Sequence, residues 1–415
     1  MSDVFNKAKK AKEVSLFLTG VTTGQKNSGL KFMAENLMSR QDYILQENAL
    51  DLKNGEKAGM SKALLDRLAL NVKRIENMAE GLKVLIDLPD PVGEVIEGST
   101  RPNGLQIIKK RVSIGVIGII YEARPNVTVD AAGLTLKSSN AVILRGSSSA
   151  INSNKAIVQV LNDALSKAGF PQGTIGLIED TSRESVQDLI TCKEFVDLVI
   201  PRGGAGLIET VINNATVPSI ETGVGNCHVY VDKDARKEII VPIVINSKVQ
   251  RPSVCNAAET LLLHEDIADE MMPLIIRELK KNKVEIFGCP KTQKFDKEVK
   301  VATEEEYKTE FLDYKIAVKI VKDIKEAVKH INTYGTLHTE AVISENYTTL
   351  ELFKSQVDAA AIMVNTSTRF TDGFEFGFGA EIGISTQKMH ARGPMGLREL
   401  TTYKYIVEGN GQIRG

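Results

Sequence analysis

One cysteine in the chain has neighbours that could make it a nucleophile. Cys255 follows Arg251, Pro252 and Ser253 in the run Gln250–Asn256. A cysteine attacks as its thiolate, so a nearby cation or helix N-terminus must lower a thiol pKa that starts near ~8.5. Arg251 would supply the cation, and Ser253 would cap a short helical turn that opens at Cys255. The alternative is a small buried apolar side chain, which is the usual role of a free cysteine.

Cys227 is the competing nucleophile, because His228 follows it and could act as a base. Adjacent residues on a strand point to opposite faces of the sheet, so Cys227 ranks second. Cys192 and Cys289 have no supporting neighbours. The cysteines show neither a CxxC pair nor a metal-like spacing, and we predict no metal site.

Two turns between a strand and a helix could hold the phosphates of a dinucleotide, although a GxGxxG fingerprint is absent. Gly203 and Gly204 open a helix, where backbone N–H groups attract an anion. The second turn offers a guanidinium and hydroxyl groups, at Arg145, Gly146, Ser147 and Ser148. No acid follows Leu144 to hold a ribose 2′-hydroxyl, which favours NADP over NAD. Each turn alone is equally an ordinary connection with a serine cap.

Other polar residues could assist the thiol. Asn126 follows a strand and a proline, where its amide could face a developing oxyanion. Glu221 ends a predicted short strand, residues 217–220, and could act as a general base. Arg369 and Thr371, in a glycine-rich loop, could recognise a polar substrate. Each of these residues also has a purely structural interpretation, as part of a turn or loop.

Alternating apolar strands and amphipathic helices must position these side chains. Strands are predicted at residues 112–121, 141–144, 196–200, 229–231 and 260–263. The helices between them favour parallel sheets that are covered on both faces. Residues 1–95 are predicted to be mostly helical. A hairpin is predicted over residues 98–113 and an edge strand over residues 401–407.

The composition excludes several classes of protein. A chain of 415 residues is expected to form two or three domains. Its net charge of −1 predicts no general attraction to nucleic acid or membrane, and the absence of Trp weakens base stacking. The N-terminus lacks the apolar core of a signal peptide, and no apolar run approaches the ~20 residues that span a bilayer. We therefore expect a soluble cytoplasmic protein.

Taken in order, several segments resemble the aldehyde dehydrogenase superfamily. They are residues 117–126, 141–149, 221–226 and 249–260. The run from Ala327 to Gly335, with His338, resembles the signature of one member and is the most specific element. The resemblance covers nearly the whole chain.

The resemblance implies an α/β fold with two parallel-sheet domains and a small β oligomerisation element. The dinucleotide-binding domain would comprise residues 1–97 and 116–227, and the catalytic domain residues 228–399. The oligomerisation element would comprise the hairpin 98–115 and the strand 400–415. A homo-oligomer, either a dimer or a tetramer, is implied.

Roles are implied by position. Cys255 would be the nucleophile, and Asn126 with the Cys255 backbone N–H would form an oxyanion hole. Glu221 falls where aldehyde-oxidising relatives keep their general base. Glu310 falls near the carboxylate that binds the nicotinamide ribose. Arg145 would face the adenosine phosphate, together with Ser147 and Ser148.

The chain departs from aldehyde-oxidising members just before the nucleophile. Arg251, Pro252 and Ser253 stand where those members usually carry a Gly-Gln pair. An arginine near the thiolate can hold a leaving phosphate, so Arg251 and Ser253 would bind a phosphorylated substrate.

The implied activity is NADPH-dependent reduction of L-glutamyl 5-phosphate to L-glutamate 5-semialdehyde and phosphate. It would proceed through a thioester on Cys255, as the second step of proline biosynthesis, with glutamate 5-kinase as a functional partner. Two alternatives remain open. One is an aldehyde-oxidising dehydrogenase in which Glu221 activates water, and the other is a non-catalytic nucleotide-binding protein that kept the fold.

Overall fold

The computed structural model describes residues 2–414, except for the side chains of Ala63 and Ala205. The chain divides into two compact units. The first unit comprises Met1–Thr222, Gly377–Gly383 and Met395–Gly415, and the second comprises Gly223–Phe376 and Ile384–Pro394. Among the described residues, no helix combines the length and the apolar character needed to cross a membrane.

The N-terminal part of the first unit is helical, as the sequence predicts. Its helices are α1 (Asp3–Leu18), α2 (Thr23–Ser39), α3 (Gln41–Lys57), α4 (Lys62–Leu68) and α5 (Val72–Asp87). Side-chain oxygens of Ser2, Thr22, Ser61 and Asn71 cap four of them by accepting a backbone N–H bond. Helix α5 ends at Asp87, and the next residue, Leu88, has an extended backbone, which is favoured because Pro89 follows.

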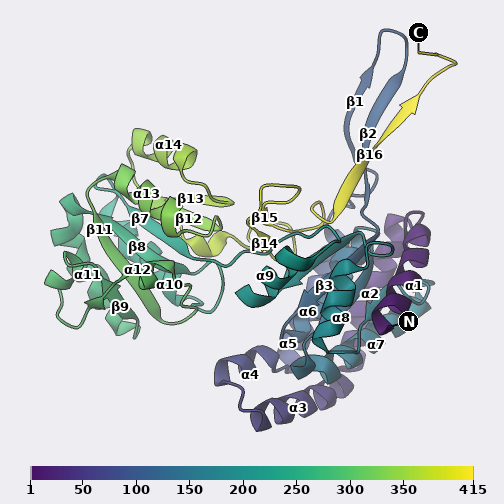
Figure 1. The fold of residues 1–415 in the computed structure, drawn as a ribbon, viewed down its shortest axis with the longest axis horizontal. Coiled ribbons are helices and arrows are strands. Elements are labelled where there is room, and N and C mark those ends of the chain that lie inside the picture. Colours follow the sequence, from purple (N-terminus) through teal and green to yellow (C-terminus); the bar gives the residue numbers. More distant parts are fainter. Residues whose placement is uncertain (1, 415) are drawn as a thin grey trace. The chain divides into compact units, whose positions relative to one another are not determined.

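A parallel sheet forms the centre of the first unit, with strand order β5-β4-β3-β6. Its strands are β3 (Val116–Tyr121), β4 (Ala141–Gly146), β5 (Ile175–Leu177) and β6 (Leu198–Arg202). Its helices are α6 (Pro125–Lys137), α7 (Ile151–Lys167), α8 (Arg183–Thr191) and α9 (Ala205–Asn214), with the 3₁₀ turn η1 (Ser148–Ala150) before α7. Helices α6 and α7 pack on one face, and α1 and α8 on the other (Figure 1). Strands β3 and β4 are completely buried because both faces are covered.

The sequence prediction was wrong at two strands of this unit. The predicted strand at residues 112–121 is two elements, because Gly115, with φ +131°, turns the chain between β2 and β3. Residues 217–220 form no strand; in this described segment Ser219 makes a single bridge to Val199. Strand β6 begins two residues after the predicted start at residue 196.

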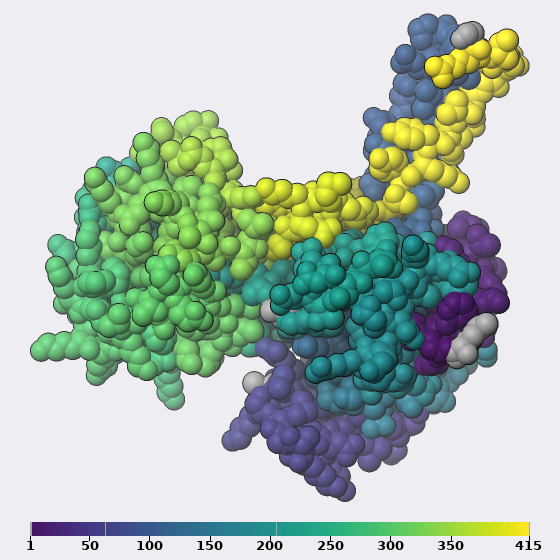
Figure 2. All heavy atoms as spheres, in the orientation of Figure 1, coloured from purple at the N-terminus to yellow at the C-terminus, as the bar shows by residue number. Residues whose placement is uncertain are grey.

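An antiparallel arm belongs to the first unit. Strands β1 (Val95–Thr100) and β2 (Gln106–Ser113) form a hairpin, and β16 (Thr401–Glu408) pairs with β2 at the edge. The predicted hairpin and edge strand are therefore confirmed. Figures 1 and 2 show these three strands, in blue and yellow, projecting from the rest of their unit.

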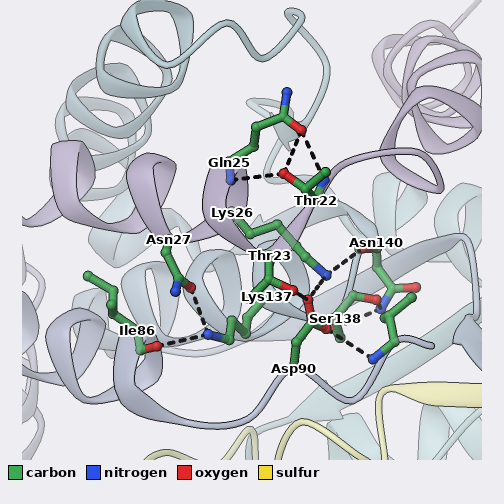
Figure 3. Close-up of polar contacts among 12 residues, drawn as sticks. Thr22, Thr23, Gln25, Lys26, Asn27, Ile86, Asp90, Lys137, Ser138 and Asn140 are labelled. Carbon is green, nitrogen blue, oxygen red and sulfur yellow. Dashed lines mark hydrogen bonds and ion pairs between the residues drawn. The ribbon is translucent and has the colours of Figure 1, made fainter. Parts of the chain in front are cut away.

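A buried polar cluster fastens the arm to its unit (Figure 3). The Lys26 ammonium, 1% exposed, pairs with Asp90 at 2.5 Å, shortly before β1. Asn140 accepts a bond from the Gly115 N–H at 2.8 Å, where the hairpin ends. Its amide also donates to the Leu400 carbonyl at 2.8 Å, where β16 begins. Both ends of the arm are therefore bound to the turn after α6.

The second unit contains a larger parallel sheet, with strand order β10-β9-β11-β8-β7-β12-β13. Its strands are β7 (Cys227–Val231), β8 (Ala258–His264), β9 (Glu285–Gly288), β10 (Lys300–Val301), β11 (Lys315–Val321), β12 (Thr339–Ile343) and β13 (Ala361–Val364). Its helices are α10 (Lys237–Val249), α11 (Ala268–Lys281), α12 (Glu304–Lys308), α13 (Ile324–Tyr334) and α14 (Tyr347–Gln356). The remaining elements are η2 (Glu265–Ile267), η3 (Thr292–Lys294), η4 (Thr368–Phe370), β14 (Ile384–Ser385) and β15 (Gly393–Pro394).

The sheet of the second unit separates two hydrophobic cores. Leu261 and Leu263 of β8 pack with α10 and α11, whereas Leu262 packs with α13 and α14. Neighbouring strand residues point to opposite faces, so one apolar run serves both cores. The predicted α/β class with two parallel sheets and a small β element is confirmed.

Candidate active site

The loop that carries Cys255 is closed at its base by a buried ion pair. This Cys255 loop (residues 250–257) joins α10 to β8. The Lys248 ammonium lies 2.5 Å from a Glu259 carboxylate oxygen, and both side chains are completely buried. Burial raises the pKa of Glu259 to about 8 and lowers the pKa of Lys248, while their mutual attraction opposes both changes. The pair joins the last turn of α10 to the start of β8.

Cys255 itself is half-buried in an irregular turn. The Ala257 N–H donates to the Val254 carbonyl at 3.0 Å. The structure has this single turn after Ser253 and no helix, because β8 begins at Ala258. The residue as a whole thus remains partly exposed to solvent.

Two residues hold the backbone of Cys255 in place. The Cys227 thiol donates to the Cys255 carbonyl at 3.2 Å. Gly225 lies so close that a Cβ there would be 1.5 Å from the same carbonyl oxygen. Burial raises the pKa of Cys227 well above its usual value, so it remains a neutral thiol donor. This environment makes Cys227 a support and favours Cys255 as the nucleophile.

Asn256 connects the Cys255 loop to the turn that contains Arg369. Its side-chain amide donates to the Thr371 carbonyl at 2.8 Å and to the Arg369 carbonyl at 3.3 Å. Arg369 Nε donates to Gln250 Oε1 at 2.8 Å, back in the Cys255 loop. Thr371 is completely buried, and its hydroxyl accepts a hydrogen bond from the Thr339 hydroxyl.

The guanidinium of Arg369 is electrostatically coupled to the nucleophile loop. Burial lowers its pKa, the Asp372 carboxylate raises it, Arg251 lowers it and Cys255 raises it. Arg369 therefore interacts with both Arg251 and Cys255, and Arg251 itself is exposed. The two predicted substrate-binding arginines thus interact with each other, and one of them, Arg369, interacts with the predicted nucleophile.

Glu310 is also tied to this neighbourhood. Its carboxylate accepts the Gly225 N–H at 2.7 Å. Leu312, which has a left-handed backbone with φ +52°, donates its N–H to the buried Glu259 at 3.2 Å. The segment around Glu310 is therefore held to residues on both sides of Cys255 in the sequence.

The remaining predicted residues lie in the first unit, after the carboxyl ends of its strands. Asn126 is exposed in the first turn of α6, after β3. Gly204 caps α9 after β6, and its N–H donates to the Glu122 carboxylate at 3.1 Å. Gly203 lies beside the same carboxylate. Glu221 is half-buried in the segment after the bridge at Ser219.

Arg145 occupies a different position from the one predicted. It is buried, and its guanidinium donates to the carbonyls of Thr181 and Ser182 at 2.8 and 2.7 Å. Burial lowers its pKa. Ser147 is half-buried and Ser148 is exposed at the start of η1. A ligand after β4 would therefore meet the two serines, with Arg145 behind them.

Comparison with known proteins identifies the family of this chain. The aldehyde dehydrogenase family model matches residues 3–296. The chain belongs to the aldehyde dehydrogenase family. Members of this family use NAD or NADP, so the family confirms a nicotinamide dinucleotide as the class of cofactor.

Relatives of this aldehyde dehydrogenase agree with the sequence prediction. A γ-glutamyl phosphate reductase of Heliobacterium modesticaldum is 58% identical over 413 residues, which cover 100% of this chain and 99% of that protein. The γ-glutamyl phosphate reductase structure of Thermotoga maritima has a TM-score of 0.97 at 51% identity, with 100% of both chains covered. An engineered glycolyl-CoA reductase with bound NADP⁺ shares the fold alone, at 16% identity and a TM-score of 0.70, over 98% of this chain and 97% of that one.

Sequence reasoning missed most of the residues that support the site. Lys248 and Glu259 are separated by 11 positions across a loop, which is neither a helical nor a strand spacing. Asn256 and Thr371 are 115 positions apart. The one available signal was Gly225, since a glycine can mark a close approach between two backbones.

Proposed function

We propose that this chain reduces L-glutamyl 5-phosphate to L-glutamate 5-semialdehyde and phosphate, with NADPH as the reductant. This reaction is the second step of proline biosynthesis. One observation carries the proposal: the Arg369 guanidinium interacts electrostatically with both Arg251 and Cys255, in a chain 58% identical to a γ-glutamyl phosphate reductase. Paired guanidinium groups suit an acyl phosphate, because the phosphate carries the charge that they bind.

The first chemical step forms a bond between Cys255 and the substrate. The thiolate attacks the acyl carbon, and the resulting oxyanion accepts bonds from the Asn126 amide and the Cys255 backbone N–H. The carbon–oxygen bond to phosphate then breaks, and the phosphate leaves with the electron pair. Arg251 and Ser253 stabilise the leaving group, and Arg369 binds substrate beside them. The product of this step is a thioester on Cys255.

The groups exposed after β4 and β6 fit a phosphate-bearing cofactor. The Gly204 N–H, at the N-terminus of α9, donates to the Glu122 carboxylate, and a cofactor phosphate would replace that carboxylate as the acceptor. Ser147 and Ser148 would hold the adenosine phosphate, with Arg145 positioning their turn, and Glu310 would bind the nicotinamide ribose. NADPH, when bound, supplies a hydride to an acyl carbon. Gly146 and Gly203 would also bind the cofactor, through the backbone of these two turns.

The last step releases the product from the sulfur. Once the acyl carbon has been reduced, its oxyanion collapses and Cys255 leaves as a thiolate, which frees the aldehyde. Asn126 again stabilises the charged oxygen. No water is consumed in this direction, so Glu221 contributes less than Cys255.

We also propose assembly of a homo-oligomer, a dimer or a tetramer, through the arm. Its strands expose large apolar side chains that a second copy would cover: Val95, Ile96, Tyr403, Tyr405 and Val407. The domain roles predicted from the sequence follow, with cofactor binding in the first unit and acyl transfer in the second. Glutamate 5-kinase would be the functional partner, in the cytoplasm.

The reverse reaction provides the test. Glutamate semialdehyde and NADP⁺ are given to the wild type, Cys255→Ala and Glu221→Ala, with and without inorganic phosphate. The wild type should require phosphate, Cys255→Ala should lose about 10³-fold or more in rate, and Glu221→Ala should retain most of the rate. Cys192→Ala, the same change at another half-buried cysteine, is the matched control. Turnover without phosphate, or a Glu221→Ala enzyme as inactive as Cys255→Ala, would instead indicate an aldehyde-oxidising enzyme.

A further inference from the structure

One carboxylate faces the amide that the proposed reaction needs. Asn126 and Asp130 lie four positions apart on α6, and therefore on the same side of the helix. The Asn126 Nδ2 donates to Asp130 Oδ2 at 3.1 Å. Asn126 is exposed at the start of the helix, whereas Asp130 is half-buried one turn further in. The half-buried Asp130 carboxylate thus lies behind the exposed Asn126 amide and contacts it.

The chemistry of this contact determines how the amide is oriented. An ionised carboxylate can only accept hydrogen bonds, whereas an amide has an NH₂ that donates and an oxygen that accepts. With Asp130 ionised, the NH₂ of Asn126 must face it, and a flipped amide would bring two oxygens together. The NH₂ has a second N–H, which remains available to an acceptor in front of the helix. Position 126 also lies at the helix N-terminus, where the backbone favours negative charge.

Asp130 retains its charge in a place where charge is disfavoured. Burial raises its pKa to about 6, against the hydrogen bond from Asn126 and the charge of Arg202 at the end of β6. Among the described residues, the Asp130 carboxylate accepts its side-chain hydrogen bond from the Asn126 amide.

We infer that Asp130 is a positioning residue that directs an N–H of Asn126 toward the oxyanion on the acyl carbon of the substrate. This inference rests on the proposed function, because it requires Asn126 to serve the oxyanion. Asp130 itself touches no reacting atom. It acts by excluding the flipped amide, which would present an oxygen to the developing negative charge.

The test combines two substitutions in the phosphate-dependent assay with glutamate semialdehyde and NADP⁺. Asp130→Asn should lower kcat about 10- to 100-fold, because the amide can now flip, with the KM values of phosphate and NADP⁺ within about twofold of wild type. Asn126→Ala should lower kcat about 10²-fold or more. Adding Asp130→Asn to Asn126→Ala should change nothing further, because no amide remains to be oriented.

Two controls address the fold. Asp163→Asn makes the same change on α7, where Asp163 forms an exposed ion pair with Arg40, and should have wild-type kinetics. Asp130→Glu keeps an acceptor-only carboxylate one turn behind Asn126 and should restore more kcat than Asp130→Asn. A folded Asp130→Glu variant whose kcat is no higher than that of folded Asp130→Asn would overturn the inference.

The outcomes separate the inference from the function on which it rests. If Asn126→Ala is impaired and Asp130→Asn has wild-type kcat, the inference is overturned and the proposed function stands. If Asp130→Asn lowers kcat equally in both backgrounds, Asp130 acts through the fold and the inference is again overturned. If Asn126→Ala retains wild-type kcat, Asn126 is not the oxyanion donor, and the inference is overturned together with that assignment.

Discussion

The start of α6 and the Cys255 loop position their chemical groups in opposite ways. Asn126 is oriented by a residue four positions away on the same helix. Cys255 is held by residues far away in the sequence: Cys227 is 28 positions distant, and Asn256 reaches a residue 115 positions distant. One site is positioned locally and the other by the tertiary fold.

The difference follows from what surrounds each residue. A helix already fixes the backbone of Asn126, so its side chain needs only one further contact. The Cys255 loop has no regular secondary structure, so its backbone must be held by other segments. Those segments come from different strands and turns of the second unit. Cys255 should therefore be the more sensitive of the two to distant substitutions.

Replacement of Gly225 should have the largest effect. In Gly225→Ala the new Cβ would lie 1.5 Å from the Cys255 carbonyl oxygen, so the loop must move. We expect activity to be lost and the free energy of unfolding to fall by about 5 kcal/mol or more. Gly81→Ala on α5, where nothing lies within 4 Å of the added atom, should instead stabilise by up to about 1 kcal/mol. Urea titration and the phosphate-dependent assay measure both; an active Gly225→Ala enzyme would show that the close approach is unnecessary.

Removal of Lys248 should have the next largest effect on stability. Lys248→Met leaves the Glu259 carboxylate buried without its cation, which should cost about 3–5 kcal/mol. The double variant Lys248→Met/Glu259→Leu should recover much of this loss, because no uncompensated charge remains. Lys237→Met removes an exposed pair with Glu270 and should cost less than about 1 kcal/mol. Equal losses for the two lysine variants would contradict the importance of the buried pair.

Asn256→Ala should have a smaller effect that is more specific to the substrate. Two carbonyl groups lose a donor, which should cost about 1–3 kcal/mol. Because Arg369 is no longer anchored, we expect the KM for phosphate to rise about tenfold while the KM for NADP⁺ stays unchanged. Asn332→Ala, which removes an exposed bond to the Gln356 carbonyl, is the control and should change neither constant. A parallel rise in both KM values would mean that Asn256 supports the fold only.

Asp130→Asn should change the free energy of unfolding least, and it should raise this free energy where the preceding substitutions lower it. The folded-state pKa of Asp130 is raised to about 6, so the stability it contributes is present at low pH and lost as the pH rises toward 6. Above pH 6 the variant should be about 1–2 kcal/mol more stable than wild type, an estimate reduced because Asp130 is partly exposed. The difference should vanish below about pH 4. Urea titrations at several pH values would detect it, and a less stable variant at pH 7 would contradict it.

Much of the fold was predictable because each element carries its own pattern. Strand β4 is a continuous apolar run, the caps before α1, α2 and α5 are Ser, Thr and Asn, and the hairpin has a Pro-Asn-Gly turn. The predictions differed from the structure where a pattern was too short to distinguish a strand or a helix from a turn. Residues 217–220 are apolar enough for a strand but meet a neighbour only at Ser219. The residues before Cys255 resembled the start of a capped helix, but β8 begins at Ala258 and leaves no space for a helix.

The sequence alone determined the nature of the chemical groups: a thiol beside an arginine, hydroxyls and glycines after strands, and the family to which they belong. Only the tertiary structure decided which groups meet. The buried Arg145 guanidinium donates to the carbonyls of Thr181 and Ser182, and Lys248 forms an ion pair with Glu259. The physical reason is that periodicity reveals which face of an element is buried, whereas contacts between distant residues depend on strand order and register. Those are set by packing of the whole chain, and no local pattern contains them.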